Sequence, residues 1–238
     1  MALRAVPSRC ASWFVVAGLA VLHASLLAWC AGRTSPVLQE PAHLASGLSH
    51  LERDHYALYR VNPPLVRSVA ALPLRWAEVN TDWTRLSLDP LRRTEFDVGQ
   101  DFLRANADKL EDLFFWSRLA VLPLSLVGLI VCYLWGSELF GRSSGMLAAL
   151  LWACSPTVLG HASLITPDAH AAALGVAAMY GFSRWIRRPT FSAGLVVGSV
   201  LGLALLAKTS LLLLCPALAA IWLVRIAIPR CRQMAFAE

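Results

Sequence analysis

Residues 119–135 read LAVLPLSLVGLIVCYLW, an apolar stretch without a charged side chain. A helix that crosses a bilayer needs about 20 mainly apolar residues, so this stretch predicts a membrane-spanning helix. Residues 11–31, ASWFVVAGLAVLHASLLAWCA, form a second run of the same kind near the N-terminus. Two such runs in one chain predict a protein that is embedded in a membrane.

Three further apolar runs cover residues 144–159, 169–186 and 191–222. The last is too long for one span, and we expect two short spans hinged near Lys208. The composition agrees, because 57% of the chain is hydrophobic and 15% is charged, against about 25% charged in soluble domains. The predicted fold is all-α, a polytopic bundle of about six transmembrane helices in a single membrane domain, residues 1–238.

The run at residues 11–31 has two interpretations, a cleaved signal peptide or a first membrane span that stays in place. The run is long for the apolar core of a signal peptide. Trp29 also occupies the position where a small residue would precede the cleavage site. We therefore expect an uncleaved first span.

Residues 33–117 are predicted to form one large hydrophilic loop between the first span and a five-span segment, residues 119–228. This loop holds 12 of the 15 acidic residues, which leaves the basic excess in the short connections between spans. Because Lys and Arg in short connections mark the cytoplasmic side, we expect a cytoplasmic N-terminus and a periplasmic or lumenal loop, most simply in a bacterial inner membrane. The basic residues that support this orientation are Arg4, Arg9, Arg142, Arg184, Arg187, Arg188, Arg225, Arg230 and Arg232.

The net charge of +6 could also indicate a nucleic-acid partner. That function needs a basic stripe on one face of a domain, often interleaved with aromatic side chains, and the sequence contains no such stripe. We therefore expect membrane lipids among the partners and no nucleic acid.

The loop has an internal pattern of its own. Residues 41–51 place Leu44, Leu48 and Leu51 at helical spacing, which predicts a short amphipathic helix on the membrane surface. Pro63 and Pro64 interrupt the chain, and residues 65–76 predict a second helix of this kind. The polar remainder is expected to be a surface segment that is partly helical over residues 102–113.

Four stretches together resemble the GT-C superfamily of membrane glycosyltransferases, which includes the protein O-mannosyltransferases and the aminoarabinose transferases that modify lipid A. They are SPVLQEPAHLASGL (35–48), RVNPPLVRSVAALP (60–73), ELFGRSSGMLAALLWACSPTVLGHASLITPDAHAAAL (138–174) and GLALLAKTSLLLLCP (202–216). The resemblance implies transfer of a sugar from a polyprenyl-phosphate carrier to a lipid, glycan or protein acceptor on the outer face of the membrane. A lipid-linked sugar donor is then the expected partner.

The resemblance also implies a catalytic carboxylate at the start of the loop. Members of the superfamily usually carry an Asp-Glu pair there, and this chain has Gln39 and Glu40. Glu40 is therefore the candidate base, unless it only stabilises a helix N-terminus through the helix dipole. His43 lies three residues further on the same helix face and could share a divalent metal ion or a proton with Glu40, or could belong to an exposed polar face.

Further candidates come from the later stretches of the resemblance. Asp168 follows Thr166 and Pro167 and is the second candidate catalytic carboxylate, or else a cap of the next span. Lys208 and Arg67 are candidates for binding the carrier phosphate, with a lysine that extends to the membrane surface as the alternative for Lys208. His161 and His170 flank Asp168 and could line the same cavity.

GT-C enzymes usually have more spans and a C-terminal soluble domain. The chain is therefore expected to be a shortened product, a half that pairs with a partner chain supplying the missing spans, or a degenerate relative. The alternative function is a non-catalytic membrane scaffold or partner subunit that keeps the same fold. A transporter is a third interpretation, which the few polar residues in the middle spans disfavour.

Overall fold

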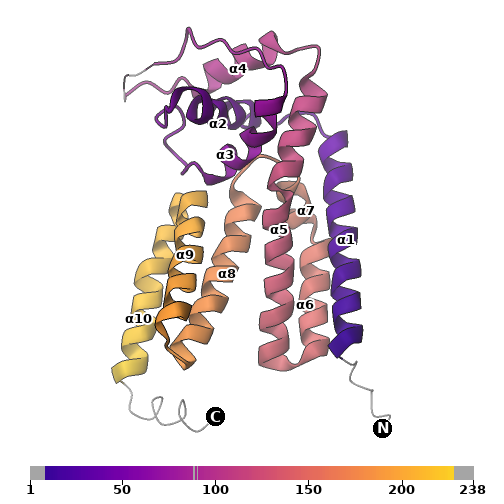
Figure 1. Ribbon diagram of the computed structural model, residues 1–238, viewed down its shortest axis with the longest axis vertical. Coiled ribbons are helices and arrows are strands. Elements are labelled where there is room, and N and C mark those ends of the chain that lie inside the picture. The colour runs from indigo at the N-terminus through magenta and orange to yellow at the C-terminus, as the bar shows by residue number, and fades with distance from the viewer. Residues whose placement is uncertain (1–8, 88, 90, 228–238) are drawn as a thin grey trace.

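The computed structural model describes residues 9–87, 89 and 91–227, and these residues form helices and loops without a β-strand. Figure 1 shows two layers. Long helices stand side by side in one layer, which we call the bundle, and residues 34–109 gather at one end of it as a second layer, which we call the loop layer. Helix α1 begins and α10 ends at the opposite end of the bundle.

The bundle contains the elements that the apolar runs predict. They are α1 (Arg9–Arg33), α5 (Leu110–Phe140), α6 (Arg142–Cys154), α7 (Pro156–Ala162), α8 (Asp168–Arg187), α9 (Phe191–Ala207), the 3-10 helix η2 (Thr209–Leu213) and α10 (Leu214–Ala227). The last apolar run is divided at Lys208, where the expected hinge lies. Arg4, Arg230 and Arg232, which support the predicted orientation, lie outside the described residues.

Three helical segments of the described chain are long and apolar enough to cross a membrane, namely α1, α5 and residues Thr209–Ala227. The pair α6 and α7 adds a fourth candidate, bent by 54° between Cys154 and Pro156. Proline at the first position of α7 fits a helix start, and the Ser155 hydroxyl accepts a hydrogen bond from the backbone N–H of Val158. The chain is an integral membrane protein.

Glycines let α5 and α6 approach closely. A Cβ at Gly145 would lie 1.9 Å from Ser137 Oγ and 2.5 Å from the Tyr133 carbonyl oxygen, so only glycine fits there. A Cβ at Gly128 would lie 2.2 Å from Cζ2 of the Trp152 indole, so glycine is needed there too. Small residues at helix contacts are the usual means of packing helices in a bilayer, where burial from water does not drive association.

The loop layer contains α2 (Glu40–Arg53), α3 (Leu65–Ala71), the 3-10 helix η1 (Leu72–Trp76) and α4 (Glu95–Ala105). The alternative that His43 belongs to an exposed polar face is wrong, because all residues from Glu40 to His50 are buried. That α2 lies on the membrane surface stays a prediction. Gly47 and Gly99 explain this burial. A Cβ at Gly47 would lie 2.2 Å from the Arg67 carbonyl oxygen, and one at Gly99 would lie 2.7 Å from the Ala42 nitrogen.

Helix α4 differs from the helix expected over residues 102–113. It ends at Ala105, and α5 begins only at Leu110. The buried Asn106 causes the break, because its side chain donates to the carbonyl oxygens of Phe102 and Asn80 and accepts from the Asn80 backbone N–H. An Asn side chain that bonds the backbone in this way competes with continuation of the helix.

Candidate functional site

Glu40 opens α2 and is fully buried. Its Oε1 accepts hydrogen bonds from Arg118 Nε at 2.9 Å and from the Ile165 backbone N–H at 2.9 Å. Its Oε2 accepts from Arg118 Nη2 at 2.6 Å and from the Val37 backbone N–H at 3.0 Å. Both carboxylate oxygens are therefore occupied by fixed donors from three other segments of the chain.

Arg118 completes this junction from the first part of α5. Its Nη1 donates to the carbonyl oxygens of Ala31 at 2.8 Å and Thr34 at 2.7 Å, and its Nη2 reaches that of Ser35 at 3.3 Å. Only 2% of the arginine is exposed. The pair of Glu40 and Arg118 thus joins the end of α1 and the start of α2 to α5.

Arg118 was not among the candidate residues predicted from the sequence. A signal for it existed, because an arginine beside an apolar run needs a partner when it is buried. The catalytic role of Glu40 stays a prediction. To accept a proton, the Glu40 carboxylate would first have to leave the two guanidinium donors of Arg118. The neighbouring Gln39 is exposed at the N-cap of α2.

Asp168 and Lys208 form a second ion pair, at the boundary between the two layers. Asp168 opens α8, and Lys208 lies between α9 and η2. Their side chains are 43% and 34% exposed, so this carboxylate can meet another molecule while the one on Glu40 cannot. The next residue, Thr209, donates to the Val61 carbonyl oxygen at 3.1 Å and ties this part of the bundle to the loop layer.

His43, Tyr59 and Arg67 stack against one another in the loop layer, close enough to feel the charge of Asp168. The rings of His43 and Tyr59 lie 4.3 Å apart, and the Arg67 guanidinium carbon lies 5.4 Å from the centre of the Tyr59 ring. Burial, together with the positive charge of Arg67, lowers the pKa of His43 to about 4, while the negative charge of Asp168 opposes this shift. His43 is therefore neutral at pH 7.

Arg67 stays charged, although burial lowers its pKa to about 10. The residue is only 3% exposed, yet its Nε and Nη1 have no hydrogen-bond partner among the residues that the structure describes. His43 Nε2 is in the same condition. A buried cation with unpaired donors is costly, so this arrangement favours an anion beside Arg67.

Comparison with protein families decides which family the chain belongs to. Residues 110–233 match the sequence model of a family described as dolichyl-phosphate-mannose-protein mannosyltransferase, and this match covers more than half of the chain. The chain belongs to the dolichyl-phosphate-mannose-protein mannosyltransferase family. The match confirms the resemblance to GT-C glycosyltransferases. Comparison with curated proteins and with solved structures found no match.

The mannosyltransferase match divides the candidate residues into two groups. It begins at Leu110 with α5 and includes Arg118, Asp168 and Lys208. Glu40, His43 and Arg67 lie before it, in the loop layer. The contacts described above bring the two groups together, so the candidate site of this mannosyltransferase-family chain is built where the loop layer meets the bundle.

Three other histidines, His170, His161 and His50, differ in burial and in the contacts that they make. His170 is fully buried, and its Nε2 bonds the Leu164 carbonyl oxygen at 3.2 Å. His161 is exposed at the end of α7, within electrostatic range of Asp168. His50 stacks on Tyr56 and shares a hydrogen bond with Ser68, so it supports the loop layer from inside.

The metal site considered for Glu40 and His43 gains no support from the geometry. Within residues 9–87, 89 and 91–227, no three His, Cys, Asp or Glu side chains gather as metal ligands would. The two oxygens of Glu40 already bond Arg118. A metal ion held by Glu40 and His43 stays a prediction.

Proposed function

We propose that this chain transfers a sugar from a polyprenyl-phosphate carrier to a hydroxyl group of a lipid, glycan or protein. Membership of the dolichyl-phosphate-mannose-protein mannosyltransferase family supports this reaction and favours mannose as the sugar. The observation that carries the proposal is that two charged features act on the same His43 ring: the exposed Asp168–Lys208 pair, and Arg67, whose buried guanidinium keeps two unpaired donors. The transfer needs a carboxylate as base and cations for the phosphate.

Each charge then has a chemical role. The acceptor oxygen forms a bond to the anomeric carbon of the sugar while the bond from that carbon to the carrier phosphate breaks. Asp168 takes the proton of the acceptor hydroxyl as general base. Arg67 and Lys208 bind the phosphate, which leaves with the bonding electrons and gains negative charge in the transition state.

We assign Glu40 a positioning role in this reaction. Its Oε1 holds the backbone N–H of Ile165, three residues before Asp168, and Arg118 holds Glu40 in turn. The turn that carries the general base is thereby fixed to the loop layer that carries Arg67. His43 stacks on Tyr59, beside the Arg67 guanidinium, and contributes a neutral ring to the donor site.

We propose six membrane spans, with α6 and α7 as one bent span and with α8 and α9 as two shorter spans. Successive spans then alternate between the two ends of the bundle. The start of α6 and the last turn of α8 lie at the end of the bundle away from the loop layer (Figure 1), and they carry Arg142, Arg184 and Arg187. Arg187 also pairs with Glu138. By the positive-inside rule this end is cytoplasmic, and the loop layer faces the periplasm or lumen, as expected for a bacterial inner-membrane enzyme.

The proposal is tested with the full chain in lipid nanodiscs and polyprenyl-phosphate-mannose as donor. Total membrane lipid and a Ser/Thr-rich peptide serve as acceptors, and release of polyprenyl phosphate is measured. Asp168→Asn is expected to slow release by about 10²-fold or more, the usual contribution of a general base. Arg67→Gln is expected to raise the KM for the donor.

Asp108→Asn is the matched control, because Asp108 is exposed in the loop layer and takes no part in the proposed site. It should keep the wild-type rate. If wild-type protein with normal helical content does not cleave the donor, the proposed enzymatic function is contradicted and the non-catalytic scaffold remains as the alternative. An unchanged rate in Asp168→Asn would contradict the role of this carboxylate.

A further inference from the structure

A groove of about 670 Å³ lies between η1 and the first turns of α5, formed by residues outside the proposed sugar-transfer site. Leu74 and Leu113 are buried and form its base, with 4% and 5% exposure. Trp76 and Trp116 also line it, and 83% and 57% of these residues are exposed. Two exposed indoles over an apolar base make a surface that attracts an amphipathic ligand.

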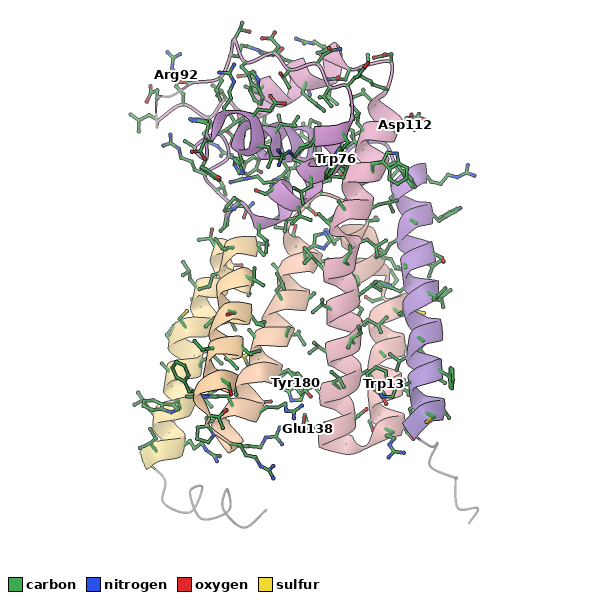
Figure 2. The ribbon with its side chains drawn as sticks, in the orientation of Figure 1. Trp13, Trp76, Arg92, Asp112, Glu138 and Tyr180 are labelled. Atoms are coloured by element: carbon green, nitrogen blue, oxygen red, sulfur yellow. The ribbon has the colours of Figure 1, made fainter. Side chains whose placement is uncertain are left out.

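Three charged side chains also line this groove: Glu78, Lys109 and Asp112. In the part of the chain that the structure describes, none of the three side chains takes part in an ion pair or a hydrogen bond. Figure 2 places Trp76 and Asp112 at the end of α5 that meets the loop layer. The groove thus offers two carboxylates, one ammonium and two aromatic rings together.

The length of α5 shows at which depth of the membrane this groove lies. At 1.5 Å per residue the 31 residues of α5 span about 46 Å, whereas the hydrocarbon core of a bilayer is about 30 Å thick. Near the far end of α5, Glu138 forms an ion pair with Arg187, and because charged side chains are costly in hydrocarbon this pair favours a place at the opposite membrane surface. The first turns, including Asp112 and Trp116, therefore extend beyond the hydrocarbon to the level of the lipid headgroups, where Trp is enriched.

We propose that this groove binds the phosphoethanolamine headgroup of a phospholipid from the leaflet on the side of the loop layer. Glu78 and Asp112 accept hydrogen bonds from the primary ammonium, and Lys109 binds the phosphate. Trp116 and Trp76 cover the glycerol and the start of the acyl chains. A phosphatidylglycerol headgroup lacks the cation, and the trimethylammonium of phosphatidylcholine has no N–H to donate.

Lipid titration of the full chain in detergent, read by native mass spectrometry, tests this site. The lipids are phosphatidylethanolamine, phosphatidylcholine and phosphatidylglycerol with identical acyl chains. Wild-type protein is expected to bind phosphatidylethanolamine more tightly than the other two lipids. The double variant Glu78→Gln with Asp112→Asn is expected to bind phosphatidylethanolamine about two- to fivefold more weakly than wild type, as for partly exposed charge pairs. Lys109→Gln should weaken all three lipids by removing the shared phosphate contact.

Asp108→Asn and Trp29→Leu are the matched controls, because both side chains are exposed and neither lines the groove. They should bind lipid as wild type does. Equal affinity of wild type for the three lipids would overturn the proposal, and so would an unchanged preference in the double variant. If the double variant does not fold, as judged by its helical circular dichroism, the single variants Glu78→Gln and Asp112→Asn take its place, and an unchanged preference for phosphatidylethanolamine in both would overturn the proposal. Sugar transfer is not measured, so the result is independent of the proposed reaction.

Discussion

At the scale of single residues, two ion pairs of opposite character lie on either side of a short turn. Glu40 and Arg118 are buried and saturated, whereas Asp168 and Lys208 are partly exposed. A buried pair contributes little net stability when it forms, but removal of one partner leaves an unpaired charge. The first pair therefore holds the chain segments around it in place, and the second is accessible to another molecule, as the proposed reaction requires.

Replacing Arg118 alone by Met is expected to destabilise the fold by about 3–5 kcal/mol, because the Glu40 carboxylate stays buried without its cation. The double variant Glu40→Gln with Arg118→Met should recover most of this loss. The measurement is thermal unfolding in detergent, followed by tryptophan fluorescence. Additive losses in the double variant would show that the two residues do not act as a pair.

His43 predicts a dependence of stability on pH. Its pKa is about 4 in the folded chain and 6.5 as a free side chain, so the unfolded state takes up the proton first as the pH falls. The contribution of His43 to the free energy of unfolding is therefore fully present above pH 6.5. About 3 kcal/mol of this free energy is lost as the pH falls from 6.5 to 4. Comparing wild type with His43→Gln over this range of pH should show a smaller loss in the variant.

The exposed His161 provides the control for this experiment. His161→Gln should follow the wild-type pH curve. A His43→Gln variant with the same pH dependence as wild type would contradict the assigned burial.

At the scale of elements, α2 is the centre of the loop layer, with α3 on one side and α4 on another. Its glycine at position 47 sets the distance to α3, because the Arg67 carbonyl lies where a Cβ would be. Arg67 is on α3, so the same contact that packs the two helices also positions the proposed phosphate ligand. The packing of α2 against α3 and the proposed phosphate binding are thus linked through Arg67.

Gly47→Ala is expected to push α3 away and to destabilise the chain by about 1–3 kcal/mol, as overpacking does. It should also raise the KM for the polyprenyl-phosphate donor, since Arg67 moves with α3. Gly198→Ala in α9 is the matched control, because a Cβ there meets nothing within 4 Å. That variant should be neutral or slightly more stable. Wild-type stability and KM in Gly47→Ala would contradict the proposed link.

At the scale of the whole molecule, the bundle and the loop layer were predictable to different degrees. Apolar runs gave the helices of the bundle and the break at Lys208, because membrane length and hydropathy are local properties of a sequence. The burial of α2 was not predictable, since it depends on α4, which follows it after a long polar stretch. The partner of Glu40 was hidden for the same reason, because Arg118 lies 78 residues away.

The proposed orientation predicts which residues face the outside of the cell. In a chain whose native cysteines are replaced, Asp108→Cys should react with a membrane-impermeant thiol reagent applied to intact cells. Arg188→Cys, at the other end of the bundle, should react only after the membrane is opened. The reverse pattern would place the loop layer in the cytoplasm.

The buried junction at Glu40 also constrains how the protein is made. Glu40 is synthesised 78 residues before Arg118 and 125 residues before Ile165, its two most distant donors. At about 5–20 residues per second, its carboxylate waits about 4–16 seconds for the guanidinium and longer for the turn before Asp168. The junction that ties the loop layer to the bundle is therefore complete only when α5 and the turn after α7 have been synthesised.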